Sequence, residues 1–376
     1  MTAKRNIPFF NYPALFKSQE KDLMDTLYDV MSRGAYILQK DLTEFESNLE
    51  KFLDVKHAFG VADGTNALIL ALRAAGIGDG DEVVLCSHTY IATAASVHFA
   101  GAKPVLVECG SDHMIDPQDV VRAISEKTRA IMPTQLNGRT CDMDALQSIA
   151  EKHQLIIIED AAQALGSKFK GKFAGTFGAA GAFSFYPAKL LGCFGDGGAV
   201  VTNDDRIAEK LFLLRDHGRN KEGEVVIWGT NCRLDNIQAA VLNLKLKTFE
   251  RNIARRREIA HMYHQALKDI SHLKLPPGPN DKDKRHFDVY QNYEIEADYR
   301  DELKKYLAEN GIGTIIQWEG KAVHQFKGLG FDNVKLPVVD RMTSRFLMLP
   351  MHTALTDEEV GYVSDRILEF YEKIVH

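Results

Sequence analysis

A continuous apolar run at Leu155–Ile158 constrains the fold more than any other feature of this chain. A leucine followed by three isoleucines is typical of a strand buried on both faces of a parallel sheet. Further strands are predicted at Glu82–Cys86, Pro104–Val107 and Arg129–Pro133, with helical segments such as Met143–His153 between them. Towards the C-terminus the sequence predicts one long helix over about Asn236–Leu267, a strand at Gly313–Trp318, and a final helix that opens with a capping-box-like stretch at Thr356–Glu359. Because strands that alternate with helices build parallel sheets with helices packed on them, the pattern predicts an α/β fold.

An acidic pair follows the run at Leu155–Ile158 directly, and its second member is Asp160. Ligands of open α/β sheets bind beyond the carboxyl ends of the strands, so Asp160 lies where a cofactor would be. The alternative is an aspartate that caps a helix or is solvated at the strand end. Asp160 alone does not decide between these two interpretations.

A single lysine, Lys189, lies in the glycine-rich stretch Gly181–Asn203, after a strand that Pro187 ends. A lysine in a desolvated pocket favours its neutral amine, which can attack a carbonyl and form a Schiff base. The alternative is a surface lysine on a flexible loop. Pyridoxal phosphate requires a lysine for its aldehyde and a carboxylate for its ring nitrogen, and Lys189 and Asp160 supply both. The chain between them is long enough for a hairpin between two neighbouring strands.

An anion site is predicted where a strand, a glycine turn and a helix follow one another. The strand is expected at His57–Val61, and Gly64, Thr65 and Asn66 lie at the start of the helix. Free N–H groups and the helix dipole favour a phosphate at such a position. The same sequence is also explained by a plain helix cap from Thr65 or Asn66.

Composition excludes several classes of protein. The 376 residues favour two domains, and the 45% hydrophobic and 26% charged contents are those of an ordinary globular protein. A net charge of −6 argues against a nucleic-acid surface, and no apolar run approaches a membrane span or a signal-peptide core. The five cysteines match no metal-binding spacing and are expected to be reduced thiols of a cytoplasmic protein, so no metal site is predicted.

Two long motifs then make a resemblance specific: EDAAQALGS at Glu159–Ser167 and GTFGAAGAFSFYPAKLLGCFGDGGAVVTND at Gly175–Asp204. With them, the chain resembles the DegT-type sugar aminotransferases, pyridoxal-phosphate enzymes of the aspartate-aminotransferase fold. The resemblance runs in register over nearly the whole chain. It implies a three-layer α/β/α large domain with a mostly parallel mixed sheet in residues 1–245. A linking helix and a smaller α+β domain would occupy residues 246–376.

The resemblance also implies roles for individual residues. Lys189 would hold the cofactor and move protons, and Asp160 would hold the proton on the ring nitrogen. The other cofactor contacts it implies are Gly64, Thr65, Asn66 and Ser184 for the phosphate, Asn231 for the phosphate of the neighbouring subunit, Tyr90 stacked on the ring and Gln163 at the phenolic oxygen. The sugar contacts it implies are Tyr36, Tyr186 and His324. From chemistry alone, Tyr90 could equally fill the core, Tyr36 could pack in a loop and Asn231 could be a turn residue.

The activity implied is transfer of an amino group from an amino acid, L-glutamate in most of the family, to a nucleotide-linked keto sugar for amino-sugar and surface-polysaccharide synthesis. The resemblance further implies a homodimer with shared active sites. Gln163, where many relatives have histidine, favours a 3-keto over a 4-keto sugar. Gln135 and Asn137 depart from the family pattern near the expected active-site mouth.

Two alternatives use the same scaffold. A pyridoxal-dependent nucleotide-sugar dehydratase is one, and Lys189 counts against it because some members of that branch carry histidine there. A regulatory protein without catalytic activity is the other, and the complete set of cofactor residues counts against it.

Overall fold

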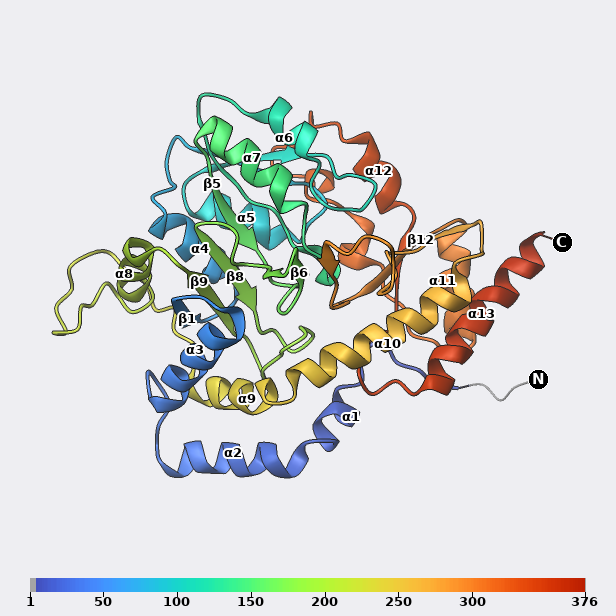
Figure 1. Cartoon of the computed structure of the whole chain (residues 1–376), viewed down its shortest axis with the longest axis horizontal. Helices are drawn as coiled ribbons and strands as arrows, with labels where there is room; N and C mark the ends of the chain where they lie inside the picture. The colour runs from blue at the N-terminus through green and yellow to red at the C-terminus, as the bar shows by residue number, and fades with distance from the viewer. Residues whose placement is uncertain (1–4, 376) are drawn as a thin grey trace.

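The computed structural model describes residues 5–375, and a seven-stranded sheet forms its centre (Figure 1). The strand order is β1-β9-β8-β5-β4-β2-β3. Every neighbouring pair is parallel except those of β9, which is antiparallel to both β1 and β8. The strands are β1 (His57–Val61), β2 (Glu82–Cys86), β3 (Lys103–Val107), β4 (Thr128–Ile131), β5 (Ile156–Asp160), β8 (Ala180–Ser184) and β9 (Gly198–Thr202). The predicted α/β fold with a mostly parallel mixed sheet is confirmed.

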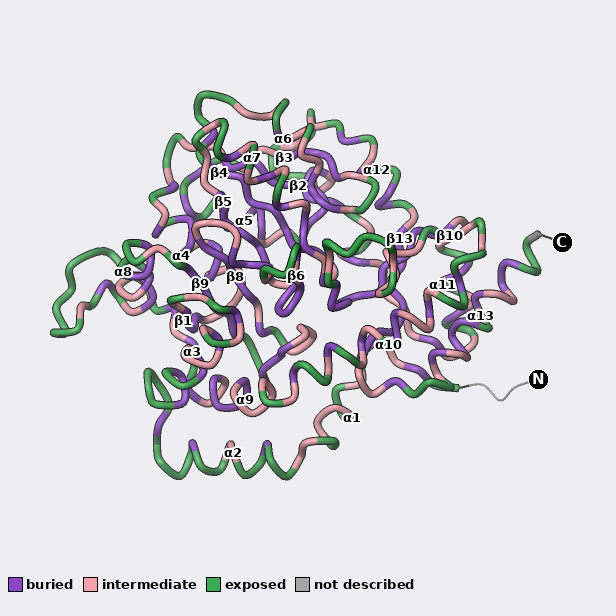
Figure 2. The backbone as a smooth tube through the Cα atoms, viewed as in Figure 1, coloured by how far each residue is buried: buried purple, intermediate pink, exposed green. Residues whose placement is uncertain are grey.

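Helices pack on both faces of this sheet. Successive side chains of a strand point to opposite faces. In β9, accordingly, Val200 joins the core with α4 (Gly64–Ala74) and α8 (Asp205–Leu214), while Val201 joins the core with α3 (Lys40–Leu53) and α9 (Asn236–Leu246). The other helices against the sheet are α5 (Ile91–Phe99), α6 (Pro117–Ala123) and α7 (Met143–His153). Figure 2 shows the strands as the most continuously buried part of the molecule.

A hairpin connects β5 to β8, as the sequence predicted. Its strands are β6 (Lys168–Phe169) and β7 (Lys172–Phe173), and they form a small sheet with β11 (His286–Phe287). Since β5 and β8 are parallel neighbours, the hairpin returns the chain to the same end of the sheet. Asp160 and the segment that carries Lys189 therefore emerge at the same edge.

A second core surrounds a three-stranded antiparallel sheet. Its elements are β10 (Leu273–Lys274), β12 (Tyr293–Ala297), β13 (Phe346–Leu349), α10 (Phe249–Leu267), α11 (Arg300–Glu309) and α13 (Asp357–Val375). Helix α10 contributes Phe249 to the large-sheet core and Tyr263 to the second core. Residues between Ala322 and Phe346, including α12 (Pro337–Thr343), also pack in the large-sheet core. The boundary at residue 245 stays a prediction.

The structure corrects several local predictions. The long helix expected from Asn236 to Leu267 is two helices, because the chain breaks between α9 and α10. The strand expected at Gly313–Trp318 does not form; a short 3₁₀ turn, η2 (Gln317–Gly320), contains Trp318 and Glu319 in left-handed conformation. Helix α1 (Tyr12–Lys17) and the short turns η1 (Leu136–Gly138) and η3 (Val323–Gln325) complete the fold with α2 (Glu20–Ser32). Within residues 5–375, no helix combines the length and the apolar character needed to cross a bilayer.

Candidate active site

Asp160 and Lys189 influence each other's charge at the carboxyl edge of the large sheet. Burial raises the pKa of Asp160, while hydrogen bonds and the charge of Lys189 lower it in part. Burial lowers the pKa of Lys189, and the charge of Asp160 opposes this shift. Among residues 5–375, no hydrogen bond or ion pair involves the Lys189 Nζ. Because its pKa is lowered, the Lys189 amine is more readily neutral than that of an ordinary lysine. A neutral amine is what nucleophilic attack on a carbonyl requires.

A chain of buried hydroxyls holds the Asp160 carboxylate. Thr93 donates to the Asp160 Oδ2 at 2.7 Å, and the Ala162 N–H donates to Oδ1 at 3.2 Å. The Thr93 hydroxyl also contacts that of Thr89 at 2.7 Å, which in turn contacts Thr134 at 2.9 Å. Sequence reasoning missed these threonines. The available signal was the pair of threonines, four residues apart, that follows strand β2.

The predicted phosphate cradle has the close backbone approach that an anion site needs. A Cβ on Gly64 would lie 2.8 Å from the Ser184 Cβ, so only glycine lets the start of α4 come this close to the Ser184 hydroxyl. The cap of α4 is Asp63, and both of its carboxylate oxygens accept from Asn66. The alternative in which Thr65 or Asn66 caps this helix is therefore wrong. Within the described chain, the N–H groups of Gly64 and Thr65 have no recorded acceptor and are free for an anion.

Tyr90 lies on the surface at the start of α5. Its side chain is 55% exposed, and its ring centroid lies 6.4 Å from that of Trp318. The alternative in which Tyr90 fills the core is therefore wrong. An open ring face is what stacking on a cofactor requires, and the stacking itself stays a prediction.

Gln163 lies in the loop after β5 with its amide orientation determined by a neighbour. Its Oε1 accepts from the Asn137 N–H at 2.8 Å, which leaves its Nε2 as the group available to a ligand. The departure at Gln135 has a structural role inside the protein: its side chain is buried, donates to Glu159 at 2.7 Å and accepts from the Cys141 N–H at 2.7 Å. The Gln135 N–H donates to the Asp160 carbonyl oxygen at 2.8 Å, so this residue lies beside the site with its side chain turned into the protein interior.

The predicted sugar contacts have different surroundings. Tyr36 and Tyr186 are each 52% exposed. His324 is buried, with its Nδ1 2.7 Å from the Ser87 Oγ and its Nε2 3.0 Å from the Asp340 Oδ1. Both ring nitrogens of His324 are therefore already engaged by other side chains of the protein.

A cavity of about 820 Å³ opens beside Lys189. Helix α1, residues 187–194 and helix α10 enclose it, and its lining includes Tyr12, Lys245 and Arg251. Arg251 is exposed, and no ion pair of its guanidinium is recorded among residues 5–375. The cavity combines the size of a drug-like ligand site with positive charge, which suits an anionic ligand.

The fold is that of pyridoxal-phosphate transaminases, and Lys189 and Asp160 offer the amine and the carboxylate that such a cofactor requires. The chain belongs to the DegT/DnrJ/EryC1/StrS aminotransferase family, which it matches over residues 17–368. It is 38% identical over 372 residues to dTDP-3-amino-3,4,6-trideoxy-alpha-D-glucose transaminase of Streptomyces venezuelae, with 98% of this chain and 97% of that protein covered. It is also 38% identical over 370 residues to a pleiotropic regulatory protein of Geobacillus stearothermophilus, with 97% and 99% covered.

Solved structures agree with this assignment. The crystal structure of S. venezuelae DesV in complex with a ketimine intermediate has a TM-score of 0.92 and 37% identity, with 97% of this chain and 98% of that chain covered. The structure of NtdA from Bacillus subtilis with bound cofactor PMP has a TM-score of 0.89 and 26% identity, with 98% and 86% covered.

Proposed function

We propose that this protein is a pyridoxal-phosphate-dependent aminotransferase that moves an amino group from an amino acid to a nucleotide-linked 3-keto sugar. The amino donor that we propose is L-glutamate. The observation that carries the proposal is the buried Asp160 beside a lysine whose pKa is lowered by burial, at the carboxyl edge of this sheet. The S. venezuelae relative, whose name describes a 3-amino sugar linked to dTDP, supports the class of substrate and the position of the amine.

The residues present fit the cofactor. Gly64, Thr65 and Ser184 would hold its phosphate, Asn66 would order the turn through Asp63, and Tyr90 would cover its ring. When bound, pyridoxal phosphate supplies an aldehyde that reacts with amines and a ring that accepts the electrons of a broken bond. Asp160 would hold a proton on the ring nitrogen through its charge, and Gln163 would donate from its Nε2.

Lys189 would carry the cofactor and, once released, move the proton at the reacting carbon. Its lowered pKa supports this role, because an amine that is readily neutral can take a proton and return it at neutral pH. The basic cavity beside Lys189 would take the charged part of the sugar nucleotide, with Tyr186 and Tyr36 as exposed contacts.

The proposed working unit is a homodimer with shared sites. Asn231 is exposed and lies in a loop that also carries Val225, Val226, Ile227 and Trp228, and Trp228 is 97% exposed. This loop projects beyond α8 at the edge of the molecule (Figure 1). An exposed apolar run on a projecting loop is suited to contact with a second subunit, where Asn231 would complete the phosphate site.

Two further parts of the proposal concern the chain as a whole. Residues 1–245 would form the unit that binds the cofactor, and residues 246–376 the linking helix and the second unit. The protein would act in the cytoplasm, since its five cysteines are all buried free thiols.

The direct test incubates the purified protein with L-glutamate and a panel of nucleotide-linked 3-keto and 4-keto sugars, with products identified by mass. We expect a visible absorption band of bound cofactor, and amination of a 3-keto sugar. A protein with no cofactor and no product would refute the proposal and favour a regulatory role like that named for the Geobacillus relative. A product formed by loss of water would favour a dehydratase.

A further inference from the structure

The Asn137 peptide determines which end of the Gln163 amide faces the cofactor side. The Asn137 N–H donates to the Gln163 Oε1 at 2.8 Å. A flipped amide would place two donors against each other, so this contact selects one orientation. Among the described residues, the Gln163 Nε2 has no recorded partner, and the side chain presents a donor.

Asn137 is itself held from the second sheet. Its backbone is in left-handed conformation, with φ +54°. Its side chain is bound at both ends: the Oδ1 accepts from Asn292 at 2.8 Å, and the Nδ2 donates to the Glu294 Oε1 at 3.1 Å. Glu294 lies in β12, and Asn292 is the residue just before this strand. Two contacts from the second sheet therefore fix Asn137, next to the cofactor site.

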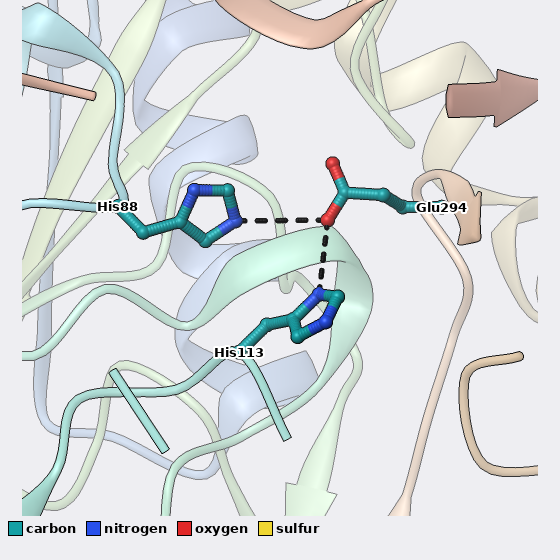
Figure 3. Close-up of side chains that lie close together, drawn as sticks. All are labelled: His88, His113 and Glu294. Carbon is teal, nitrogen blue, oxygen red and sulfur yellow. Dashed lines mark hydrogen bonds and ion pairs between the residues drawn. The ribbon is translucent and has the colours of Figure 1, made fainter. Parts of the chain in front are cut away.

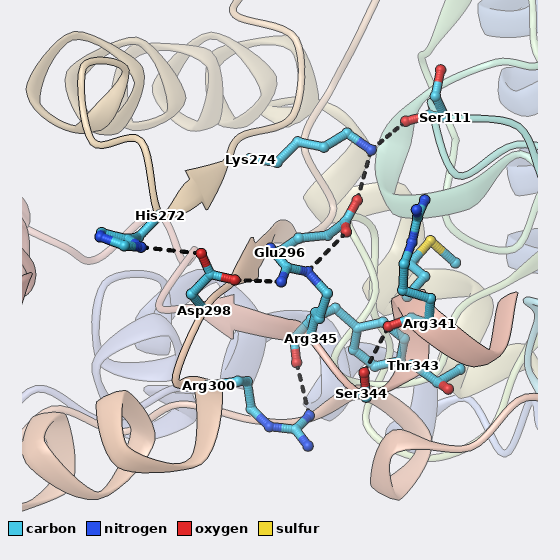
Figure 4. A network of polar contacts seen from close by, with 12 residues as sticks. Ser111, His272, Lys274, Glu296, Asp298, Arg300, Arg341, Thr343, Ser344 and Arg345 are labelled. Carbon is cyan, nitrogen blue, oxygen red and sulfur yellow. Dashed lines mark hydrogen bonds and ion pairs between the residues drawn. The ribbon is translucent and has the colours of Figure 1, made fainter. Parts of the chain in front are cut away.

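Glu294 is held in turn by two histidines that lie close to strands of the large sheet. His113 Nδ1 lies 3.2 Å from the Glu294 Oε1, and His88 Nε2 lies 3.6 Å from the same oxygen (Figure 3). His113 Nε2 contacts the Glu296 Oε1 at 2.9 Å, and Glu296 also binds Lys274 at 2.6 Å (Figure 4). Glu294 is buried, so its carboxylate depends on these donors.

We propose that Glu294 is a positioning residue of the cofactor site. Through the Asn137 side chain, it fixes the peptide N–H that turns the Gln163 amino group toward the cofactor. The inference rests on the proposed function. A glutamine at 163 has two unlike ends, and Asn137 with Glu294 selects the one that donates.

A metal ion is the rival explanation of this cluster, because His88, His113 and Glu294 offer three ligand atoms within 4.8 Å of one another. The contacts favour a proton. Both ring nitrogens of His113 face carboxylates, as in a protonated ring that donates twice. Burial opposes the charge of His113, but the hydrogen bonds that its ring donates to Glu294 and Glu296 raise its pKa to about 9.

The experiment measures the visible absorption of the bound cofactor against pH, and the dissociation constant for pyridoxal phosphate, in the holoprotein and its variants. Gln163→Ala sets the reference, with an expected shift of about one pH unit in the spectral midpoint, the effect of one hydrogen bond to a charged group. Glu294→Ala and Asn137→Gly should shift the midpoint in the same direction. Glycine at 137 keeps both the N–H and the left-handed backbone.

Two comparisons separate positioning from a general loss of structure. Glu294→Gln keeps an acceptor for Asn137 and should recover most of the wild-type spectrum. The double variant Glu294→Ala/Gln163→Ala should shift no further than Gln163→Ala alone. Glu302→Ala is the matched control. Glu302 is an exposed carboxylate of helix α11 and has no hydrogen bond or ion pair within the described chain. Its spectrum should equal that of the wild type.

Several results would overturn the inference. One is an unshifted spectrum in folded Glu294→Ala, or in Asn137→Gly if Glu294→Ala does not fold. A second is stoichiometric zinc in the purified protein that His113→Gln loses, since His113 would then be a ligand. A wild-type protein without bound cofactor would refute the proposed function and this inference together, whereas a loaded wild type with unshifted variants would refute the inference alone.

Discussion

Replacing Asp160 by asparagine separates its charge from its shape. In the structure, its two oxygens accept from Thr93 at 2.7 Å and from the Ala162 N–H at 3.2 Å. An asparagine can keep the second contact through its Oδ1 and donate from its Nδ2 to Thr93. The Thr93 hydroxyl can then turn to Thr89, which already lies 2.7 Å away. The variant should therefore fold with the same local geometry.

Activity and stability should change in opposite directions. Turnover should fall at least about 10²-fold, the typical effect of removing one preorganised electrostatic contact in a site. Without cofactor, Asp160→Asn should be more stable than the wild type at pH values above the acidic range. Burial raises the pKa of Asp160, so the folded wild type binds a proton more tightly than the unfolded chain and loses stability as pH rises. The asparagine has no such dependence, and its advantage should grow with pH.

The assay compares urea unfolding of the cofactor-free proteins from pH 4 to pH 8 with turnover of the loaded enzymes. Cofactor must be absent from the unfolding experiment, because a ligand that binds only the folded state would mask the difference. Near-normal turnover of Asp160→Asn would show that Asp160 is only a strand-end residue. A variant whose stability falls relative to that of the wild type as pH rises would contradict the argument from burial.

Four further outcomes are expected. Lys189→Ala should keep its fold but lose the covalent link that borohydride traps, and trapping at another lysine would refute its assignment. Gly64→Ala should weaken cofactor binding and cost about 1–3 kcal/mol of stability, because its Cβ would meet Ser184; an unchanged affinity would remove Gly64 from the cradle. For His113, whose pKa is raised to about 9, the stabilisation should be complete below about pH 6.5 and lost as pH rises to 9. It should not exceed about 3 kcal/mol, and His113→Gln should flatten this part of the unfolding profile; an identical slope would contradict the ion pairing. Mixing Lys189→Ala with Asn231→Ala, if the latter is impaired, should restore one native site per hybrid dimer, and no recovery after confirmed subunit exchange would mean that each site is self-contained.

Local patterns in the sequence determined much of the framework. Strand β2 and helix α7 have the bounds that their periodicity predicted, and Asp160 ends β5 as expected. The capping box before α13 is present as predicted, with the Glu359 N–H bound to the Thr356 Oγ1 and the Thr356 N–H bound to Glu359. These predictions are correct because each feature depends only on residues a few positions apart in the sequence. The periodicity of apolar residues and the identity of the capping residues can be read directly over such short distances.

Predictions failed where a nearby alternative had equal local support. The cap of α4 is Asp63 and not Thr65 or Asn66, although all three residue types cap helices. The segment expected as a strand at Gly313–Trp318 turns at η2, where Trp318 packs near His88 and Tyr90. Packing against distant residues outweighed the local preference in that segment.

Tertiary structure alone decided how the site is supported. Thr93 reaches Asp160, at the end of β5, from helix α5, and the contacts that orient Gln163 run through Asn137 to Glu294 in the second sheet. A sequence shows which groups can donate or accept, but not which distant partner each group will meet. Those partners depend on how β5, η1 and β12 are brought together. A buried polar group needs a hydrogen-bond partner, and the fold determines which partner lies within reach. Residues of the same type therefore have different roles at different places in the structure.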